Sequence, residues 1–298
     1  MVTEGRFALP TVSAAVGETW LSGWEERVVK GLAITAGTQA LVQKVHPILG
    51  HGSGAEYRLV SPENSSLWMV RIDAVSGSTV QLPTTKGDEA VYILAGELEV
   101  DGQACPAGGT VVIESGAKPA IEVVSDSSLL HMGPRDSRVP TCGLNGPIQG
   151  PAIHTHAVGA EGWYALSDAE RDSRYYADST CPTCRLTLLY TSRSSAHWSA
   201  THSHSVDELI HVLWGELHLG SHVVGPGDTL AVDADRRYGF RTPDGFGFLN
   251  YRSDASAMTI DPAAPLIGEG ALIHGFQPAD GDRFAPGAID LSTYRPSV

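Results

Sequence analysis

An internal repeat constrains the fold of this chain more than any other feature. The segment DEAVYILAGELEVDGQACPAGGTVVIESG begins at Asp88 and aligns without a gap with DELIHVLWGELHLGSHVVGPGDTLAVDAD, which begins at Asp207, at an offset of 119 residues. Two copies of one structural unit must therefore be placed in the fold. The identical pairs include Asp88/Asp207, Glu89/Glu208, Leu94/Leu213, Gly96/Gly215, Glu97/Glu216, Leu98/Leu217, Gly108/Gly227 and Thr110/Thr229.

Both copies are predicted to form β-strands. Short runs rich in Val, Ile, Leu and Tyr, such as AVYILAGELEV and LIHVLWGELHL, alternate with turn residues, and the 33 glycines and 18 prolines are spread along the chain. Short strands at regular spacing predict an all-β sandwich or barrel. Helix is expected only in short segments, for example around Ser167 to Arg171.

The repeat also predicts two domains. A length of 298 residues suits two units of ~150 residues each. The turn-rich segment TCGLNGPIQGP lies between the copies and is predicted to be a linker. We therefore expect one domain over residues 1–145 and a second over 146–298, with an extended arm at its C-terminal end.

Composition excludes several classes of function. The chain has 20 Lys and Arg against 34 Asp and Glu, a net charge of −14, which argues against a nucleic-acid or anionic-membrane partner because phosphates require a basic patch. No apolar run approaches the ~20 residues of a membrane-spanning helix, and the first residues do not resemble a signal peptide. The expectation is a cytoplasmic protein that acts on a small molecule, with a homodimer as one candidate assembly.

Three residues in the second copy form a candidate metal site. His202, His204 and Glu208 share the same parity, so side chains that alternate across a strand can place all three on one face. Two neutral imidazoles and one carboxylate suit a divalent transition metal, and this set leaves coordination positions open for water, substrate or dioxygen. The pattern predicts a catalytic rather than a purely structural metal site.

The same residues carry a resemblance to a known family. The spacing His-x-His-x3-Glu-x6-Gly, from His202 to Gly215, and the later Gly225-Pro226-Gly227-Asp228 segment resemble the two motifs of the cupin family. The resemblance covers residues 60–132 and 180–255, so the chain is similar to a bicupin. It implies two tandem jelly-roll barrels, with the metal inside the second one.

The second copy departs from the family pattern at the expected third histidine, where Tyr238 stands. That tyrosine can ligate as phenolate, act as a general acid or base beside the metal, or simply pack. Trp198 and Trp214 share the parity of the metal ligands and, with Asn250, are candidates for the substrate pocket; core filling is the alternative for the two indoles. His211 has the opposite parity to Glu208 and is expected to face away from the site.

The first copy has lost most of the ligand positions. At the same offset, Pro83, Thr85 and Pro119 replace His202, His204 and Tyr238, and only Glu89 is retained. We expect the N-terminal barrel to be metal-free and to serve as a packing partner or lid. His131, which aligns with Asn250, is expected to be a histidine with its hydrogen bonds satisfied locally.

A second, weaker candidate involves cysteine. Cys181 and Cys184 have the spacing of a zinc or redox pair, but one CxxC lacks the second pair that would make the pattern specific. The alternative is two semi-buried thiols at a turn.

The resemblance implies dioxygen insertion, isomerisation or cyclisation, decarboxylation or lyase chemistry. Two histidines and one carboxylate with open positions fit iron and dioxygen best. The first hypothesis is therefore a non-heme iron dioxygenase acting on a small organic molecule, with aromatic or diketone-like compounds as one class. The alternatives are a redox-neutral lyase, isomerase or cyclase that uses zinc, nickel or manganese with Tyr238 as acid or base, and a non-catalytic metal-binding barrel.

Overall fold

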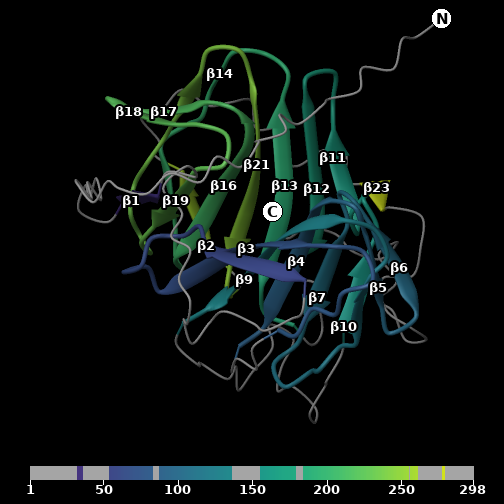
Figure 1. Ribbon diagram of the computed structural model, residues 1–298. Coiled ribbons are helices and arrows are strands. Elements are labelled where there is room, and N and C mark those ends of the chain that lie inside the picture. Colours follow the sequence, from purple (N-terminus) through teal and green to yellow (C-terminus); the bar gives the residue numbers. More distant parts are fainter. Residues whose placement is uncertain are drawn as a thin grey trace, which may run out of the picture.

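The protein is all-β in the part of the chain that the structure describes (Figure 1). The computed structural model describes residues 32–35, 54–82, 87–135, 155–178, 184–254, 256–260 and 277–278. Every regular element in these ranges is a strand, and none of the described residues forms a helix that could cross a membrane.

The N-terminal barrel is formed by two antiparallel sheets, which gather in the lower half of Figure 1. The larger sheet has the order β10 (Thr155–Val158), β7 (Thr110–Ile113), β4 (Glu89–Ala95), β9 (Ser127–Pro134), β3 (Leu67–Ala74) and β2 (Ala55–Leu59). The smaller sheet has the order β6 (Gln103–Pro106), β5 (Glu97–Val100) and β8 (Ile121–Val123).

The C-terminal barrel is formed by three sheets. The largest has the order β1 (Leu32–Thr35), β19 (Thr229–Val232), β16 (Glu208–Gly215), β21 (Phe246–Arg252), β13 (Thr187–Arg193), β12 (Arg171–Ala177), β11 (Tyr164–Ser167) and β23 (Gln277–Pro278). A second sheet has the order β14 (His197–Trp198), β20 (Arg241–Thr242), β17 (Leu217–Leu219) and β18 (His222–Val224). The third pairs β15 (His202–His204) with β22 (Met258–Ile260).

The two barrels exchange edge strands. β1, from the N-terminal part of the chain, pairs antiparallel with β19, so that Leu32 lies opposite Val232. β10 pairs antiparallel with β7 of the N-terminal barrel, with Thr155 opposite Ile113. Each exchange covers an edge that would otherwise expose unpaired backbone groups. The domain boundary at residues 145 and 146 lies outside the described residues and stays a prediction.

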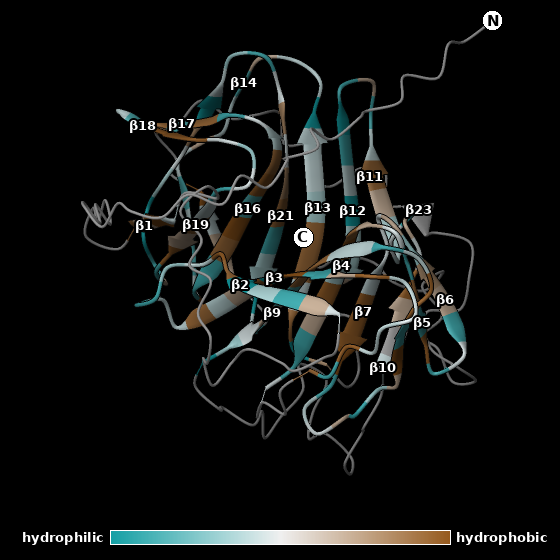
Figure 2. Ribbon diagram, viewed as in Figure 1, coloured by the Kyte–Doolittle hydropathy of each residue, from teal (hydrophilic) through white to brown (hydrophobic). Residues whose placement is uncertain are grey.

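Three hydrophobic clusters follow from the alternation of side chains across the strands. One fills the N-terminal barrel around Trp68 and Ile72, and another fills the C-terminal barrel around Ile210 and Phe248. The third lies between the barrels and combines residues of both large sheets. Figure 2 shows the hydrophobic segments of β7, β13 and β16 in brown. Burial of apolar surface between the sheets therefore joins the two barrels.

The repeat retains a glycine where each barrel turns from one sheet into the next. Gly96 and Gly215 have φ angles of 86° and 72°, in the left-handed region that favours glycine. A Cβ on Gly215 would lie 2.2 Å from the carbonyl oxygen of Gly245, and one on Gly96 would lie 2.2 Å from Ser127 Oγ. The shared glycines are therefore required by backbone conformation and close packing.

The repeat also retains an aspartate that ties each barrel to the other. Asp88 Oδ2 accepts a hydrogen bond of 2.7 Å from the backbone N–H of Arg185, which belongs to the C-terminal half. Asp207 Oδ2 accepts one from the hydroxyl of Ser66, in the N-terminal barrel. Ser66 and Arg185 are themselves separated by the repeat offset of 119 residues. The two contacts are thus related by the pseudo-symmetry of the repeat.

The expected short helix around Ser167 to Arg171 is wrong. These residues join β11 and β12 through a tight turn, in which the N–H of Asp168 donates to the carbonyl oxygen of Arg171 at 2.9 Å. Asp168 Oδ1 accepts hydrogen bonds from the N–H groups of Glu170 and Arg171, at 2.9 and 2.8 Å. An aspartate that satisfies backbone donors in this way favours a turn over a helix interior.

Candidate functional site

Three strands of the C-terminal barrel bring the predicted site residues together. Glu208 begins β16, and its register partner across the ladder to β21 is Arg252; Asn250 lies two residues earlier on β21. His202 and His204 lie on β15, and a backbone bridge pairs His202 with Tyr238. The residues of the sequence pattern therefore form one cluster inside the barrel.

Glu208 is the centre of this cluster. Its side chain is 1% exposed, and Oε2 accepts hydrogen bonds from Asn250 Nδ2 at 2.8 Å and from the guanidinium of Arg252 at 3.0 and 3.2 Å. Oε1 is also buried and has no partner of standard hydrogen-bond geometry among the described residues, although the Tyr238 side chain interacts with the Glu208 carboxylate. A buried carboxylate oxygen without a well-placed donor is energetically costly, so it marks a position suited to a ligand.

Both histidines use the same ring nitrogen to hold their orientation. His202 Nδ1 lies 2.7 Å from the carbonyl oxygen of Ala200, and His204 Nδ1 lies 3.3 Å from Ser256 Oγ. With Nδ1 as the donor, the neutral ring carries its lone pair on Nε2. Histidines that bind metals in proteins are commonly oriented in this manner. The two rings lie with centroids 5.3 Å apart, and His204 Nε2 is 3.8 Å from Glu208 Oε2.

The site has defined protonation states near neutral pH. Burial, assisted by the charge of Arg252, lowers the pKa of His204 from 6.5 to about 4, so its ring is neutral. Burial alone would raise the pKa of Glu208, but Arg252 and the other polar neighbours outweigh that effect and hold the pKa below its usual value. The cluster therefore contains a neutral imidazole, a carboxylate and a guanidinium.

Tyr238 lies beside the cluster as a neutral phenol. Its side chain is buried, and its ring packs on His202 with centroids 4.5 Å apart. Burial, followed by the negative charge of Glu208, raises the pKa of Tyr238 well above 10. A phenolate ligand is disfavoured in this environment, whereas packing on His202 and proton donation are both compatible with the geometry.

Chemically, the donor set fits a divalent metal, since it offers two imidazole nitrogens and one carboxylate. In the present arrangement, however, Arg252 Nη2 lies 2.9 Å from His204 Nε2 as well as 3.0 Å from Glu208 Oε2. Among the described residues, no three His, Cys, Asp or Glu side chains are arranged closely enough to hold a metal ion. A metal would therefore have to displace the guanidinium of Arg252.

The structure places the other candidates differently. Asn250 contacts Glu208, but Trp198 is 68% exposed and Trp214 is 39% exposed, so neither lies in the barrel interior. A bulge between Val212 and Trp214 interrupts the alternation that parity assumes. His211 lies on the opposite face of β16 from Glu208, is buried, and pairs with Thr229.

Arg252 was not anticipated from the sequence. It has the same parity as Asn250 on one predicted strand, and that signal could have identified it.

In the N-terminal barrel the retained glutamate is paired with a histidine. Glu89 Oε2 lies 2.5 Å from His131 Nε2, and both side chains are buried. Trp68 packs edge-on against His131 with ring centroids 4.6 Å apart. His131 is therefore a locally satisfied histidine, as expected. Pro83 and Thr85 lie outside the described residues.

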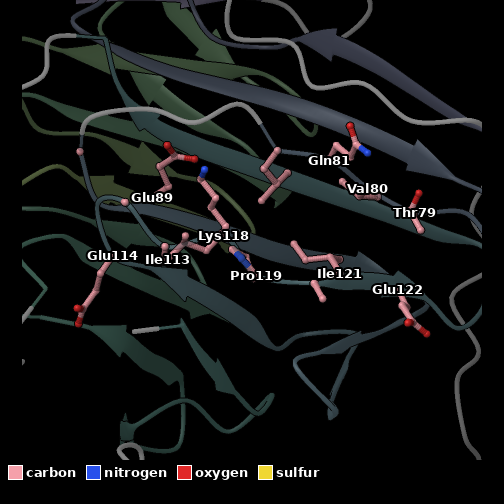
Figure 3. Close-up of a pocket in the computed structure, with 15 residues that line it drawn as sticks. Thr79, Val80, Gln81, Glu89, Ile113, Glu114, Lys118, Pro119, Ile121 and Glu122 are labelled. Carbon is pink, nitrogen blue, oxygen red and sulfur yellow. The ribbon is translucent and has the colours of Figure 1, made fainter. Parts of the chain in front are cut away.

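A cavity opens beside Glu89. Its volume is about 400 Å³, and its walls include Val80, Ile121 and the exposed Lys118 (Figure 3). Pro119, which aligns with Tyr238, also lines it. The N-terminal barrel thus has room for a small molecule next to its buried carboxylate.

Of the paired cysteines, the structure describes only Cys184. It is buried and disulfide-bonded, while Cys105 is a free, buried thiol. Cys181 lies outside the described residues.

Comparison with known proteins identifies the fold. No family model and no curated protein matches the chain. Among solved structures, a putative glyoxylate-induced protein from Pseudomonas aeruginosa matches with a TM-score of 0.60 at 13% identity, over 79% of this chain and 92% of its own. Oxalate decarboxylase from Bacillus subtilis matches with a TM-score of 0.54 at 14% identity, over 76% and 78%. The protein YlbA from E. coli matches with a TM-score of 0.53 at 15% identity, over 76% and 92%.

These matches cover both barrels and establish the class of protein. The chain has the bicupin fold, with two tandem cupin barrels built from antiparallel sheets. At 13 to 15% identity the likeness concerns the fold alone.

Proposed function

We propose that the protein is a metal-dependent enzyme whose active site is the His202, His204 and Glu208 cluster of the C-terminal barrel. The observation that carries this proposal is the orientation of the donors: both histidines use Nδ1 for local hydrogen bonds, and Glu208 Oε1 is buried without a partner of standard hydrogen-bond geometry among the described residues. Such an arrangement would provide three donor atoms for a cation once the guanidinium of Arg252 has moved away from His204 Nε2. Distant support comes from oxalate decarboxylase of Bacillus subtilis, which contains Mn(II) centres.

The three donors would hold one divalent metal, with iron favoured and manganese, zinc or nickel as alternatives. When bound, the metal would supply open positions for an oxygen-bearing substrate and for dioxygen. The chain itself keeps His204 neutral and Glu208 ionised, which is the state that both residues need as ligands.

The surrounding residues would control water and protons. Ile210, Phe240 and Phe248 belong to the apolar cluster that fills the rest of the barrel, and an apolar enclosure limits the access of bulk water. Tyr238 retains its proton because of burial and the adjacent Glu208 charge. It would therefore donate a hydrogen bond or a proton to a substrate oxygen.

Within this class we favour a non-heme iron dioxygenase acting on a small organic molecule, because two histidines and one carboxylate leave adjacent positions open. One observation favours a redox-neutral lyase, isomerase or cyclase instead. The firmly protonated Tyr238 beside Glu208 is a suitable acid for an enolate intermediate, and that chemistry needs no oxidant.

Oxygen uptake distinguishes these two functions. Protein reconstituted with Fe(II) would be screened in an oxygen electrode against small aromatic and diketone compounds, with the His202→Ala/His204→Ala double variant as control. Substrate-dependent oxygen consumption by the wild-type protein alone supports the dioxygenase. Turnover of a compound without oxygen consumption, again lost in the double variant, supports the redox-neutral function. Equal behaviour of the two proteins would refute a metal enzyme at this site.

A further inference from the structure

The strand register places Arg252 in the interior of the C-terminal barrel. Its Cα lies opposite that of Glu208 in the ladder between β16 and β21, and the side chain is 11% exposed. The preceding inward residue, Asn250, also contacts Glu208. The guanidinium is therefore built into the same layer of side chains as the candidate metal ligands.

The contacts of Arg252 use atoms that a metal would need. Nη2 lies 2.9 Å from His204 Nε2 and 3.0 Å from Glu208 Oε2, while Nε lies 3.2 Å from the same carboxylate oxygen. The lone pair of a neutral imidazole nitrogen serves one partner at a time. In addition, a guanidinium and a divalent ion in contact with one carboxylate would repel each other strongly in a buried site.

We propose that Arg252 and a divalent metal ion are mutually exclusive partners of His204 and Glu208, so that Arg252 is a built-in competitor that sets the metal affinity of the barrel. The inference rests on the proposed function, since it concerns the same site. In the metal-free protein Arg252 neutralises the buried carboxylate. On metal binding the guanidinium leaves His204 Nε2 and Glu208 Oε2.

The N-terminal barrel provides an internal comparison. The residue that aligns with Arg252 there is Gly133, and a Cβ on it would lie 2.6 Å from the indole of Trp68. Its glutamate, Glu89, is instead bound to His131. Of the two aligned positions, only the one in the barrel that retains the histidine pair carries an inward-facing arginine. In that barrel a competing cation can affect metal binding.

The test measures metal affinity rather than activity. Mn(II) and Co(II) would be titrated by calorimetry into the full chain, both as wild type and as Arg252→Met, which keeps a long apolar side chain but removes the charge. We expect the Kd to fall at least about tenfold in Arg252→Met, equivalent to ~1.4 kcal/mol. The melting temperature of that variant should be lower than that of the wild type without metal and should rise more when Mn(II) is added.

Arg185→Met is the matched control. Arg185 also pairs with a carboxylate, Asp254 at 2.6 Å, but takes part in none of the contacts described for the cluster, so its substitution removes one positive charge and one arginine–carboxylate pair away from the candidate ligands. The double variant Glu208→Gln/Arg252→Met removes the buried charge together with its partner and reports whether the barrel folds without the pair; it should fold and bind no metal.

The outcomes separate the two proposals. Tighter metal binding in Arg252→Met but not in Arg185→Met supports the competition. Equal affinities in the wild type and Arg252→Met, or an equal gain in both single variants, would overturn the competition while leaving the metal site intact. Absence of binding in both the wild type and Arg252→Met would overturn the metal site itself, and the competition with it.

Discussion

Acid sensitivity of this fold should depend on His211, which lies outside the metal cluster. Its side chain is 5% exposed, and Nδ1 lies 2.8 Å from Thr229 Oγ1. Burial, reinforced by the positive charge of Arg71 in the N-terminal barrel, lowers the pKa of His211 from 6.5 to about 4. The folded protein therefore keeps this ring neutral in a range of pH in which the unfolded chain protonates it.

The sign and size of the effect follow from that difference. Because the folded pKa is lowered, the stabilising contribution is complete above pH 6.5 and is lost as the pH falls from 6.5 to about 4. The full difference corresponds to about 3 kcal/mol, since one unit of pKa is worth ~1.4 kcal/mol. Between pH 7.5 and pH 5 the loss from His211 alone should be about 2 kcal/mol.

The assay is urea denaturation at pH 7.5 and pH 5 for the wild type and for His211→Asn, which keeps a polar atom near the position of Nδ1. The variant should lose about 2 kcal/mol less stability on acidification than the wild type does. His222→Asn, in the β17–β18 hairpin, should retain the wild-type loss. Parallel pH dependence in the wild type and His211→Asn would refute the assignment of acid sensitivity to His211.

Three further substitutions test the packing and the chemistry. Gly215→Ala should reduce the free energy of unfolding by at least about 2 kcal/mol, because the added Cβ would lie 2.2 Å from Gly245 O at a φ of 72°. Gly220→Ala, with a φ of 62° and no atom within 4 Å, should cost about 1 kcal/mol, and equal denaturation midpoints for the two would contradict this reasoning. Tyr238→Phe should leave metal content and melting temperature nearly unchanged but reduce kcat at least ~10²-fold. An unchanged kcat would show that the Tyr238 ring only packs against its neighbours and that its hydroxyl takes no part in the chemistry.

Much of the architecture could be predicted from the repeat. The ungapped alignment from Asp88 and from Asp207 predicted two equivalent β-units, and the bicupin fold confirms it. The exchange of β1 and β10 between the barrels was not predicted, since which edge a short strand covers depends on the docking of distant segments rather than on its own pattern.

The site was predicted in part. Parity predicted one face for His202, His204 and Glu208, and in the structure His204 Nε2 lies 3.8 Å from Glu208 Oε2, with the ring centroids of His202 and His204 5.3 Å apart. Asn250, a pocket candidate without a parity argument, contacts Glu208. Parity failed for Trp214 because a bulge precedes it, and bulges leave little trace in a sequence. Arg252 was overlooked since a lone arginine on a strand is usually solvated, and only its register partner Glu208 gives it a role inside the barrel.

Metal content is the most direct test of the central claim. The full chain would be reconstituted anaerobically with Fe(II) or with Mn(II), desalted and measured by elemental analysis beside the His202→Ala/His204→Ala variant. The account predicts about one equivalent of metal in the wild type and none in the variant. Wild-type protein without metal, or equal metal in both proteins, would contradict a metal centre in the C-terminal barrel.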